Sequence, residues 1–142
     1  MYLIDTCVIS EARRRTPQAV AWLNTAHPNA LFLSAITIGE IAKGIAMKAR
    51  RDPGTAVVLS RWLDELRLVY APRILPVDDA VATTWGQLMA SGSRPMADAL
   101  IAATAQCYNK ILVTRNVADF ADMGVEIVNP WTICQPHSPA RA

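Results

Sequence analysis

The sequence contains few of the residues from which zinc sites and disulfide frameworks are built. Its 142 residues include two histidines and three cysteines. His27 and His137 are far apart in the chain, and Cys7, Cys107 and Cys134 show no C-x-x-C spacing. This argues against a zinc site of the usual Cys/His type, and the odd number of thiols fits a reducing cytoplasm.

Long apolar runs and a strong net charge are also absent. No continuous apolar stretch reaches the roughly 18 residues that a membrane span needs, and the N-terminus has neither the basic region nor the cleavage site of a secretion signal. The formal net charge is +2, with 18% charged and 52% apolar residues. We therefore expect a globular cytoplasmic protein that has no membrane partner. Its slight positive charge weakly favours a polyanionic partner.

The sequence does show an alternation of strand-like and helix-like segments. Strands are expected at residues 2–4, 30–33, 73–77, 111–113 and 125–128, and helices at residues 6–14, 17–26, 37–51, 54–69, 78–90, 95–108 and 117–121. This order predicts the α/β class, with a mostly parallel sheet and helices on both faces. We expect one domain at residues 1–132 and a flexible tail at residues 133–142, where proline and small residues are frequent.

The first expected strand runs directly into an acid. The opening MYLIDTCVIS places Asp5 immediately after the apolar segment Tyr2–Ile4. A carboxylate at the end of a buried strand needs a partner, because an isolated buried charge is costly. In open α/β sheets, ligands bind at the carboxyl ends of the strands. Asp5 is therefore a candidate site residue, and other acids at this edge are its candidate companions.

A second acid stands alone in an apolar helix. Asp98 is the only charged residue of the segment MADALIAATAQC, residues 96–107. A helix that is apolar all round is a buried helix, so we expect Asp98 to be enclosed. The alternative is a first-turn acid that complements the helix dipole.

Two further acids follow expected strands. Glu40 lies near the start of its helix, and Gly44 one turn later leaves the space beside it open, although an ordinary exposed glutamate is also possible. In ILVTRNVADF, Asp119 lies one helical turn beyond Asn116. Thr114 and Asn116 also suit a turn and a helix N-cap, and Asp119 also suits a plain first-turn acid.

Four acids at one edge predict a cation site. Two carboxylates about 4 Å apart repel by roughly 4 kcal/mol at an effective dielectric near 20, so such a cluster holds a proton or binds a cation. Oxygen ligands favour a hard cation, Mg²⁺ or Mn²⁺, that keeps several waters. A metal held by carboxylates acidifies a bound water and shields a phosphate, which is the chemistry of phosphodiester hydrolysis.

Taken in order, the segments that carry these acids resemble the PIN-domain ribonucleases, and in particular the VapC and FitB-like toxins of type II toxin–antitoxin pairs. The segments are LIDT near residue 5, SAITIGEI around residue 40, DALIAATA from residue 98, and VTRNVADF at residues 113–120. The resemblance extends to RILPVD at residues 73–78 and VEIVNPW at residues 125–131. It covers nearly the whole chain, and the ordered set is more specific than any single motif.

The resemblance implies a PIN-like three-layer fold and Mg²⁺- or Mn²⁺-dependent endonucleolytic cleavage of RNA, such as tRNA or rRNA. It gives catalytic and metal-binding roles to Asp5, Glu40 and Asp98, with Glu40 bound directly or through water. Family members differ in the position of the fourth acid. One of the two positions is Asn116 in this chain, so Asp119 is expected to act as a weaker ligand, with one well-held metal ion and a second that is weak or depends on the substrate.

The resemblance also implies supporting residues and partners. Thr6, Thr114 and Asn116 are expected to support the acids by hydrogen bonding, and Arg13, Arg14, Arg15 and Arg115 are candidates for phosphate contacts. Hydrolysis by a metal-bound water would leave a 3′-hydroxyl and a 5′-phosphate. Toxins of this type usually form homodimers and are inhibited by a small antitoxin that occupies the active-site groove. The antitoxin's DNA-binding domain binds operator DNA.

Three alternatives compete with this interpretation. A phosphatase of the haloacid dehalogenase type needs a second acid where this chain has Cys7. A response-regulator receiver needs a second acid early in the chain and a lysine after residues 111–113. The third alternative, a catalytically silent PIN fold that binds an antitoxin or RNA, is favoured by the amide at Asn116.

Overall fold

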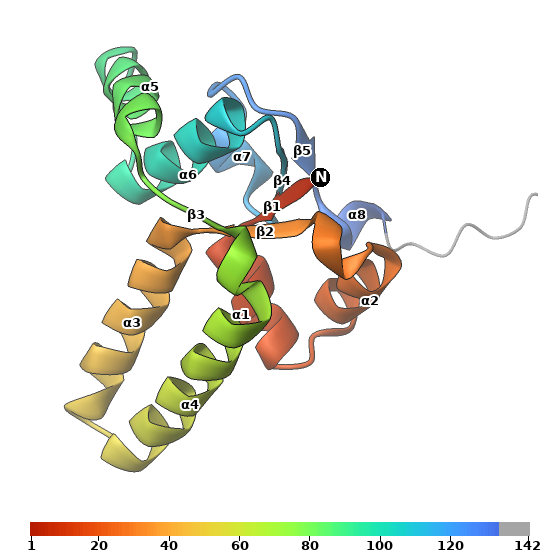
Figure 1. Cartoon of the computed structure of the whole chain (residues 1–142), viewed down its shortest axis with the longest axis vertical. Helices are drawn as coiled ribbons and strands as arrows, with labels where there is room; N and C mark the ends of the chain where they lie inside the picture. The colour runs from red at the N-terminus through yellow and green to blue at the C-terminus, as the bar shows by residue number, and fades with distance from the viewer. Residues whose placement is uncertain (134–142) are drawn as a thin grey trace, which may run out of the picture.

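The computed structural model describes residues 1–133 and contains a five-stranded parallel sheet between two layers of helices (Figure 1). The strands are β1 (Tyr2–Ile4), β2 (Leu31–Ser34), β3 (Ile74–Leu75), β4 (Ile111–Val113) and β5 (Ile127–Val128). Their order is β3-β2-β1-β4-β5, and every neighbouring pair is parallel. The predicted α/β class is confirmed. The tail expected at residues 133–142 lies, apart from its first residue, outside the described residues.

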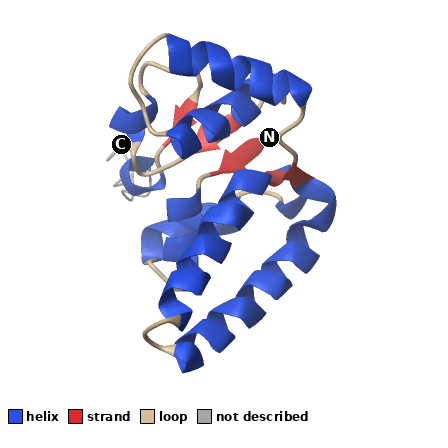
Figure 2. Ribbon diagram, turned by 90° about the vertical axis from the view of Figure 1, so that its left-hand side faces the viewer, coloured by secondary structure: helices blue, strands red, loops and turns tan. Residues whose placement is uncertain are grey.

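The helices form the outer layers. One face of the sheet is covered by α1 (Thr6–Arg13), α2 (Pro17–Thr25), α3 (Ala35–Ala49) and α4 (Pro53–Tyr70), and the other by α5 (Asp79–Ala90), α6 (Met96–Cys107) and α7 (Val117–Phe120). The short α8 (Pro130–Ile133) contacts α2, and 3-10 turns occur at Pro28–Ala30 and Ala71–Arg73. Figure 2 shows α3 and α4 extending away from the sheet as an antiparallel pair.

The alternation of side chains along each strand produces the two cores. Leu3 pairs in register with Leu112, and both contribute to the core under α6. Ile4 pairs with Val113, and both contribute to the core under α1 to α4. All four side chains are fully buried, and each contributes about 1.5–3 kcal/mol through burial. These apolar strands end together at one edge of the sheet, where the polar residues begin.

The ends of several elements differ from the sequence prediction. Helix α3 begins at Ala35 rather than Thr37, because Ser34 Oγ accepts a hydrogen bond of 3.1 Å from the Ile36 N–H and caps the helix. Strand β3 ends before Pro76, which has no N–H to donate to a ladder. Strand β5 has only two residues, and α8 was not predicted. The number and order of the strands and longer helices are as expected.

Helix α6 is buried nearly all round, as its composition predicts. Six consecutive or nearly consecutive side chains are buried: Ala99, Ile101, Ala102, Ala103, Thr104 and Ala105. None of the helices within residues 1–133 is long and apolar enough to cross a bilayer. The two cores and the buried α6 hold the carboxyl edge of the sheet in place, and the candidate acids are arranged along that edge.

Candidate active site

The carboxyl edge of the sheet gathers the four acids that the sequence singled out. Asp5 follows β1, Glu40 lies on α3 after β2, and Asp119 lies on α7 after β4. Asp98 lies in the first turn of α6, which begins at the same edge. The charges of the other three acids all act on Asp98 and raise its pKa. The four carboxylates are therefore electrostatic neighbours, as predicted.

Asp5 is the most firmly held of the four. Its side chain is 5% exposed, and its backbone N–H donates to the Val113 carbonyl at 2.9 Å. Oδ1 accepts from the Thr6 N–H at 2.9 Å, which caps α1, and Oδ2 accepts from Thr114 Oγ1 at 2.7 Å and from Cys7 Sγ at 3.4 Å. Burial raises the pKa of Asp5, and these hydrogen bonds oppose that rise. A carboxylate has about four acceptor positions, so Asp5 keeps room for one more partner.

A hydroxyl network links Glu40 to Asp5. Thr6 Oγ1 donates to Glu40 Oε1 at 2.8 Å and lies 3.1 Å from Thr37 Oγ1, while the Thr6 N–H bonds to Asp5. Thr6 therefore ties α1 to α3 and spaces the two carboxylates. Thr6 thus makes hydrogen bonds to two of the acids, as expected for a residue that supports them by hydrogen bonding.

Asp98 is only half-buried, so the prediction that it is enclosed was wrong. Its apolar neighbours on α6 are buried, but the carboxylate itself lies at the open start of the helix. Burial raises the pKa of Asp98 to about 6, with further contributions from the charges of Asp5, Asp119 and Glu40, in that order. A carboxylate with this surplus of nearby negative charge is suited to a cation.

The segment after β4 is held by a hydroxyl rather than by an acid. Thr114 is fully buried; its Oγ1 donates to Asp5 and accepts from the Asn116 N–H at 3.0 Å. Asn116 stands at the N-cap position of α7, but its side chain makes no capping bond. Asp119 is exposed, and its charge raises the pKa of both Asp5 and Asp98. Asp119 is thus the acid of this segment that acts on the cluster.

The donor set at this edge fits a hard divalent cation. It consists of carboxylate and hydroxyl oxygens whose negative charges already disturb one another. Within residues 1–133, no three Asp, Glu, His or Cys side chains lie close enough to share one ion as they stand. Mg²⁺ commonly keeps several waters and uses one or two carboxylates together with substrate phosphate oxygens, so an open arrangement of this kind suits it better than a closed protein cage.

The structure separates the four arginines that were candidates for phosphate contacts. Arg13 and Arg14 line a groove together with Thr6 and Glu40. The side chains of the other two lie elsewhere: Arg15 is exposed beyond the end of α1, and the Arg115 guanidinium lies 4.9 Å from the Trp131 ring centroid. Of the four arginines, Arg13 and Arg14 are therefore the pair that shares a groove with one of the acids, Glu40.

Sequence analysis missed one residue that contacts Asp5. Cys7 is partly buried, and its thiol donates to Asp5 Oδ2. Burial and the charge of Asp5 raise the pKa of Cys7 to about 11, so the thiol keeps its proton. Its position two residues after the strand-ending acid, in the first turn of α1, was the available signal.

Comparisons with known proteins agree with this geometry. Toxin FitB of Neisseria gonorrhoeae is 34% identical over 138 residues, covering 92% of this chain and 99% of the relative. The crystal structure of FitAcB from that organism matches with a TM-score of 0.83 at 34% identity over the same shares. VapC ribonuclease Y4jK of Sinorhizobium fredii is 33% identical over 138 residues, covering 92% of this chain and 98% of the relative.

A toxin–antitoxin complex from Klebsiella pneumoniae also matches, with a TM-score of 0.67 and 27% identity over 92% of this chain and 98% of that chain. The model of the PIN domain family matches residues 2–126, a range that includes all four acids. With its parallel sheet, its acidic carboxyl edge and these relatives, the chain belongs to the PIN domain family.

Proposed function

We propose that this chain is a metal-dependent endoribonuclease that acts as the toxin of a toxin–antitoxin pair. The observation that carries the proposal is the cluster of four carboxylates at the carboxyl edge, whose combined charge and burial raise the pKa of Asp98 to about 6. The similarity to a VapC ribonuclease supports the nuclease activity, and the similarity to Toxin FitB supports the role as a toxin.

Each acid has a role in this proposal. Asp5 and Asp98 are the principal ligands of Mg²⁺ or Mn²⁺, Glu40 binds directly or through water, and Asp119 is a weaker ligand. When bound, the ion supplies a Lewis acid for the phosphate and an acidified water for its hydrolysis. The expected products carry a 3′-hydroxyl and a 5′-phosphate, since this chemistry does not need the RNA 2′-hydroxyl.

The surrounding residues orient the acids and the substrate. Thr114 and Cys7 donate to Asp5 and fix the direction of its carboxylate, and Thr6 does the same for Glu40. Such supporting contacts commonly change metal affinity or activity by about 10–100-fold. Arg13 and Arg14, which line a groove together with Glu40, are proposed to bind phosphates of the RNA chain.

The proposed partners are those that the resemblance to toxins of this type implies. We infer a cognate antitoxin that occupies the active-site groove and carries a DNA-binding domain, through which the pair reaches operator DNA. The toxin–antitoxin complex from Klebsiella pneumoniae supports the antitoxin partner. We also infer a homodimer that acts on tRNA or rRNA in the cytoplasm.

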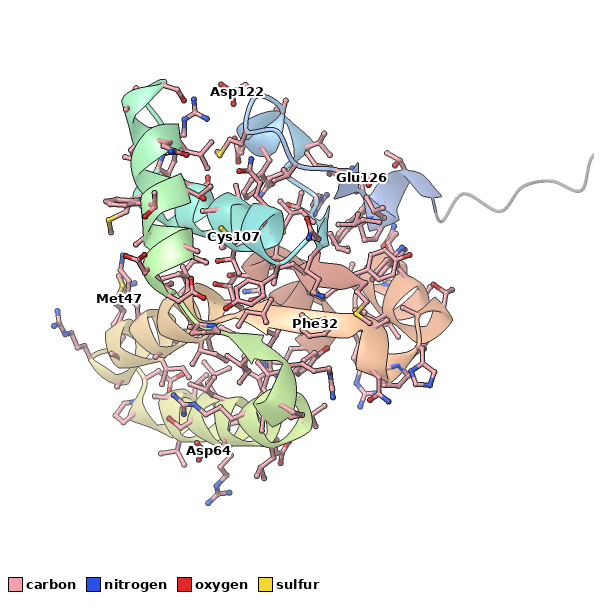
Figure 3. All side chains as sticks on the ribbon, turned by 45° about the horizontal axis from the view of Figure 1, so that its top comes forward. Phe32, Met47, Asp64, Cys107, Asp122 and Glu126 are labelled. Carbon is pink, nitrogen blue, oxygen red and sulfur yellow. The ribbon has the colours of Figure 1, made fainter. Side chains whose placement is uncertain are left out.

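A catalytically silent PIN fold is the second candidate, because Asn116 supplies an amide at a position where some members have an acid. The following experiment separates the two. Purified, antitoxin-free protein is incubated with total tRNA and rRNA in Mn²⁺, Mg²⁺ or EDTA, beside Asp5→Asn, Asp98→Asn and the control Asp64→Asn. Figure 3 shows Asp64 on the outer side of α4, on the opposite side of the molecule from Asp122.

Cleavage that requires metal, persists in Asp64→Asn and disappears in the other two variants supports the nuclease. Products that end in a 2′,3′-cyclic phosphate contradict the hydrolytic mechanism. If no RNA is cleaved, a direct Mn²⁺ titration decides: a wild-type protein that binds no more Mn²⁺ than Asp5→Asn supports the silent module.

A further inference from the structure

A groove of about 350 Å³ opens beside Glu40, between α1, α3 and α4. We call it the α1–α3–α4 groove, and it begins at Thr6 and Glu40 and runs along α3 past Gly44 to Lys48. Thr6 and Glu40 already belong to the candidate active site, so the groove is continuous with it. A volume of this size falls in the range of about 300–1,000 Å³ typical of small-ligand sites.

The charges that line this groove favour an anion. Three basic side chains, those of Arg13, Arg14 and Lys48, stand against a single acid, Glu40. The Arg13 guanidinium lies 5.6 Å from the Trp62 ring centroid, an uncharged partner that leaves its positive charge in place. The exposed Arg14 side chain pairs with Glu11 at 3.7 Å, a long surface contact of a type that contributes little.

The rest of the lining suits a nucleotide rather than a free phosphate. Ile41, Ile45 and Leu59 form an apolar wall, and the hydroxyls of Ser10 and Thr55 add hydrogen-bonding groups. Sites for single-stranded nucleic acid combine positive charge along the backbone with apolar surface for the bases. The α1–α3–α4 groove has both features, and Glu40, one of the four acids, lies in its lining.

Gly44 keeps the groove open. It lies in the interior of α3, where glycine is a poor helix former, and a Cβ built there meets nothing within 4 Å. A larger side chain at this position would occupy part of the groove without disturbing the helix.

We propose that the α1–α3–α4 groove is a subsite for one RNA nucleotide flanking the cleaved phosphodiester. Arg14 and Lys48 bind its phosphate, and Ile41 and Leu59 contact its base. The proposal rests on the proposed function for its substrate class. RNA is the occupant because the lining is basic and includes Glu40, one of the four acids.

The test measures RNA binding without cleavage. A labelled short single-stranded RNA of mixed sequence is titrated with the protein in EDTA, by fluorescence anisotropy over a series of salt concentrations. The groove variants are Gly44→Leu and Lys48→Gln. Gly86→Leu on α5, also a helix glycine with nothing within 4 Å of its Cβ, and Lys43→Gln, an exposed lysine of α3, are the matched controls.

The two groove variants should weaken binding in different ways. Lys48→Gln should lower the affinity about tenfold, as expected for one charge-assisted contact, and reduce the slope of log K against log salt by about 0.7. Gly44→Leu should lower the affinity about tenfold with an unchanged salt slope, because it removes contacts to the base but no charge. Both controls should stay within about twofold of the wild type.

Two outcomes overturn the proposal. The first is that both groove variants bind RNA with wild-type affinity. If these variants also fail to bind a co-expressed antitoxin, the groove is a protein-docking site instead. The second is a wild-type protein that binds no RNA. If RNA cleavage is intact while groove and control variants bind alike, the subsite fails and the nuclease stands. If binding depends on the groove but cleavage never occurs, the nuclease fails and the subsite stands.

Discussion

Two strand-to-helix junctions at the same edge of the sheet are built differently. At the β1–α1 junction, one buried residue, Asp5, caps the helix and also faces the site. At the β4–α7 junction, the buried Thr114 makes the structural contacts, while Asn116 and the acid Asp119 are exposed. At the first junction, the carboxylate of Asp5 serves both the stability of the fold and the candidate site. At the second, Thr114 serves stability and Asp119 serves the site, so the acid can change position without disturbing the fold.

The largest effects should come from Asp5. Asp5→Asn and Asp5→Ala should each lower metal-dependent cleavage at least about 100-fold. Asp5→Ala should also have a free energy of unfolding about 1–2 kcal/mol lower than Asp5→Asn, because alanine removes the cap of α1 and the acceptor of the Thr114 hydroxyl. Urea unfolding in EDTA measures this difference.

The same pair of substitutions at Asp119 is the control for that comparison. Asp119→Ala and Asp119→Asn should unfold alike, because the side chain is exposed, and each should retain part of the cleavage activity. Equal stability of the two Asp5 variants would show that Asp5 has no capping role, and the contrast between the junctions would be lost.

Thr114 tests whether the buried hydroxyl supports Asp5. Thr114→Val keeps the shape but removes both the donor to Asp5 and the acceptor of the Asn116 N–H. We expect a loss of about 1–2 kcal/mol in stability and a loss of about 10–100-fold in Mn²⁺ affinity, measured by titration. Thr114→Ser restores the hydroxyl and should recover most of the binding. A valine variant that binds Mn²⁺ like the wild type contradicts the supporting role.

We expect Asp98 to make the free energy of unfolding depend on pH. Its pKa is about 6 in the folded protein against an ordinary value of 3.8, so between these values the folded state binds more protons than the unfolded state. The free energy of unfolding of the metal-free protein should therefore fall as the pH rises from 4 to 6, and change little above that. Because Asp98 is half-exposed and screened by water, we expect about 1 kcal/mol rather than the full value of the shift.

The check compares urea unfolding in EDTA at low and neutral pH. Asp98→Asn should flatten the dependence and be more stable than the wild type at pH 7, whereas the exposed control Asp64→Asn should leave it unchanged. Asp5, whose pKa is also raised by burial, keeps a residual dependence of the same sign. Stability that rises with pH over this range would contradict the repulsion among the acids.

The sequence predicted those features that depend on local pattern. The apolar segment before Asp5 and the segment before Thr114 predict buried strands, and buried parallel strands bring their polar ends to one edge. The apolar composition of residues 96–107 predicts the buried helix that begins at Asp98. The four acids could therefore be predicted as neighbours before any contact was known.

Features that depend on contacts between distant segments could not be predicted. The exposure of Asp98 depends on how the start of α6 meets the sheet, and the pairing of Asp5 with Thr114 joins residues 109 positions apart. The groove beside Glu40 depends on the side-by-side packing of α3 and α4. Capping by the Asn116 side chain was expected from residue type but does not occur; the Asp119 N–H donates to the backbone carbonyl of Asn116 at 3.1 Å.

The smallest effect should come from restoring an acid at the second junction. Asn116→Asp adds a carboxylate at an exposed position near Asp119, and exposed charge interactions are weak in water. We expect Mn²⁺ affinity to rise by no more than about fivefold, measured by titration beside Asn29→Asp, an exposed asparagine between α2 and β2. A much larger rise would show that a carboxylate at position 116 binds the ion directly. The two junctions would then differ only in which residue type follows the strand. A rise within the expected range means that Asp119 already fills the fourth position, and that this junction tolerates an amide because its buried contacts are made by Thr114.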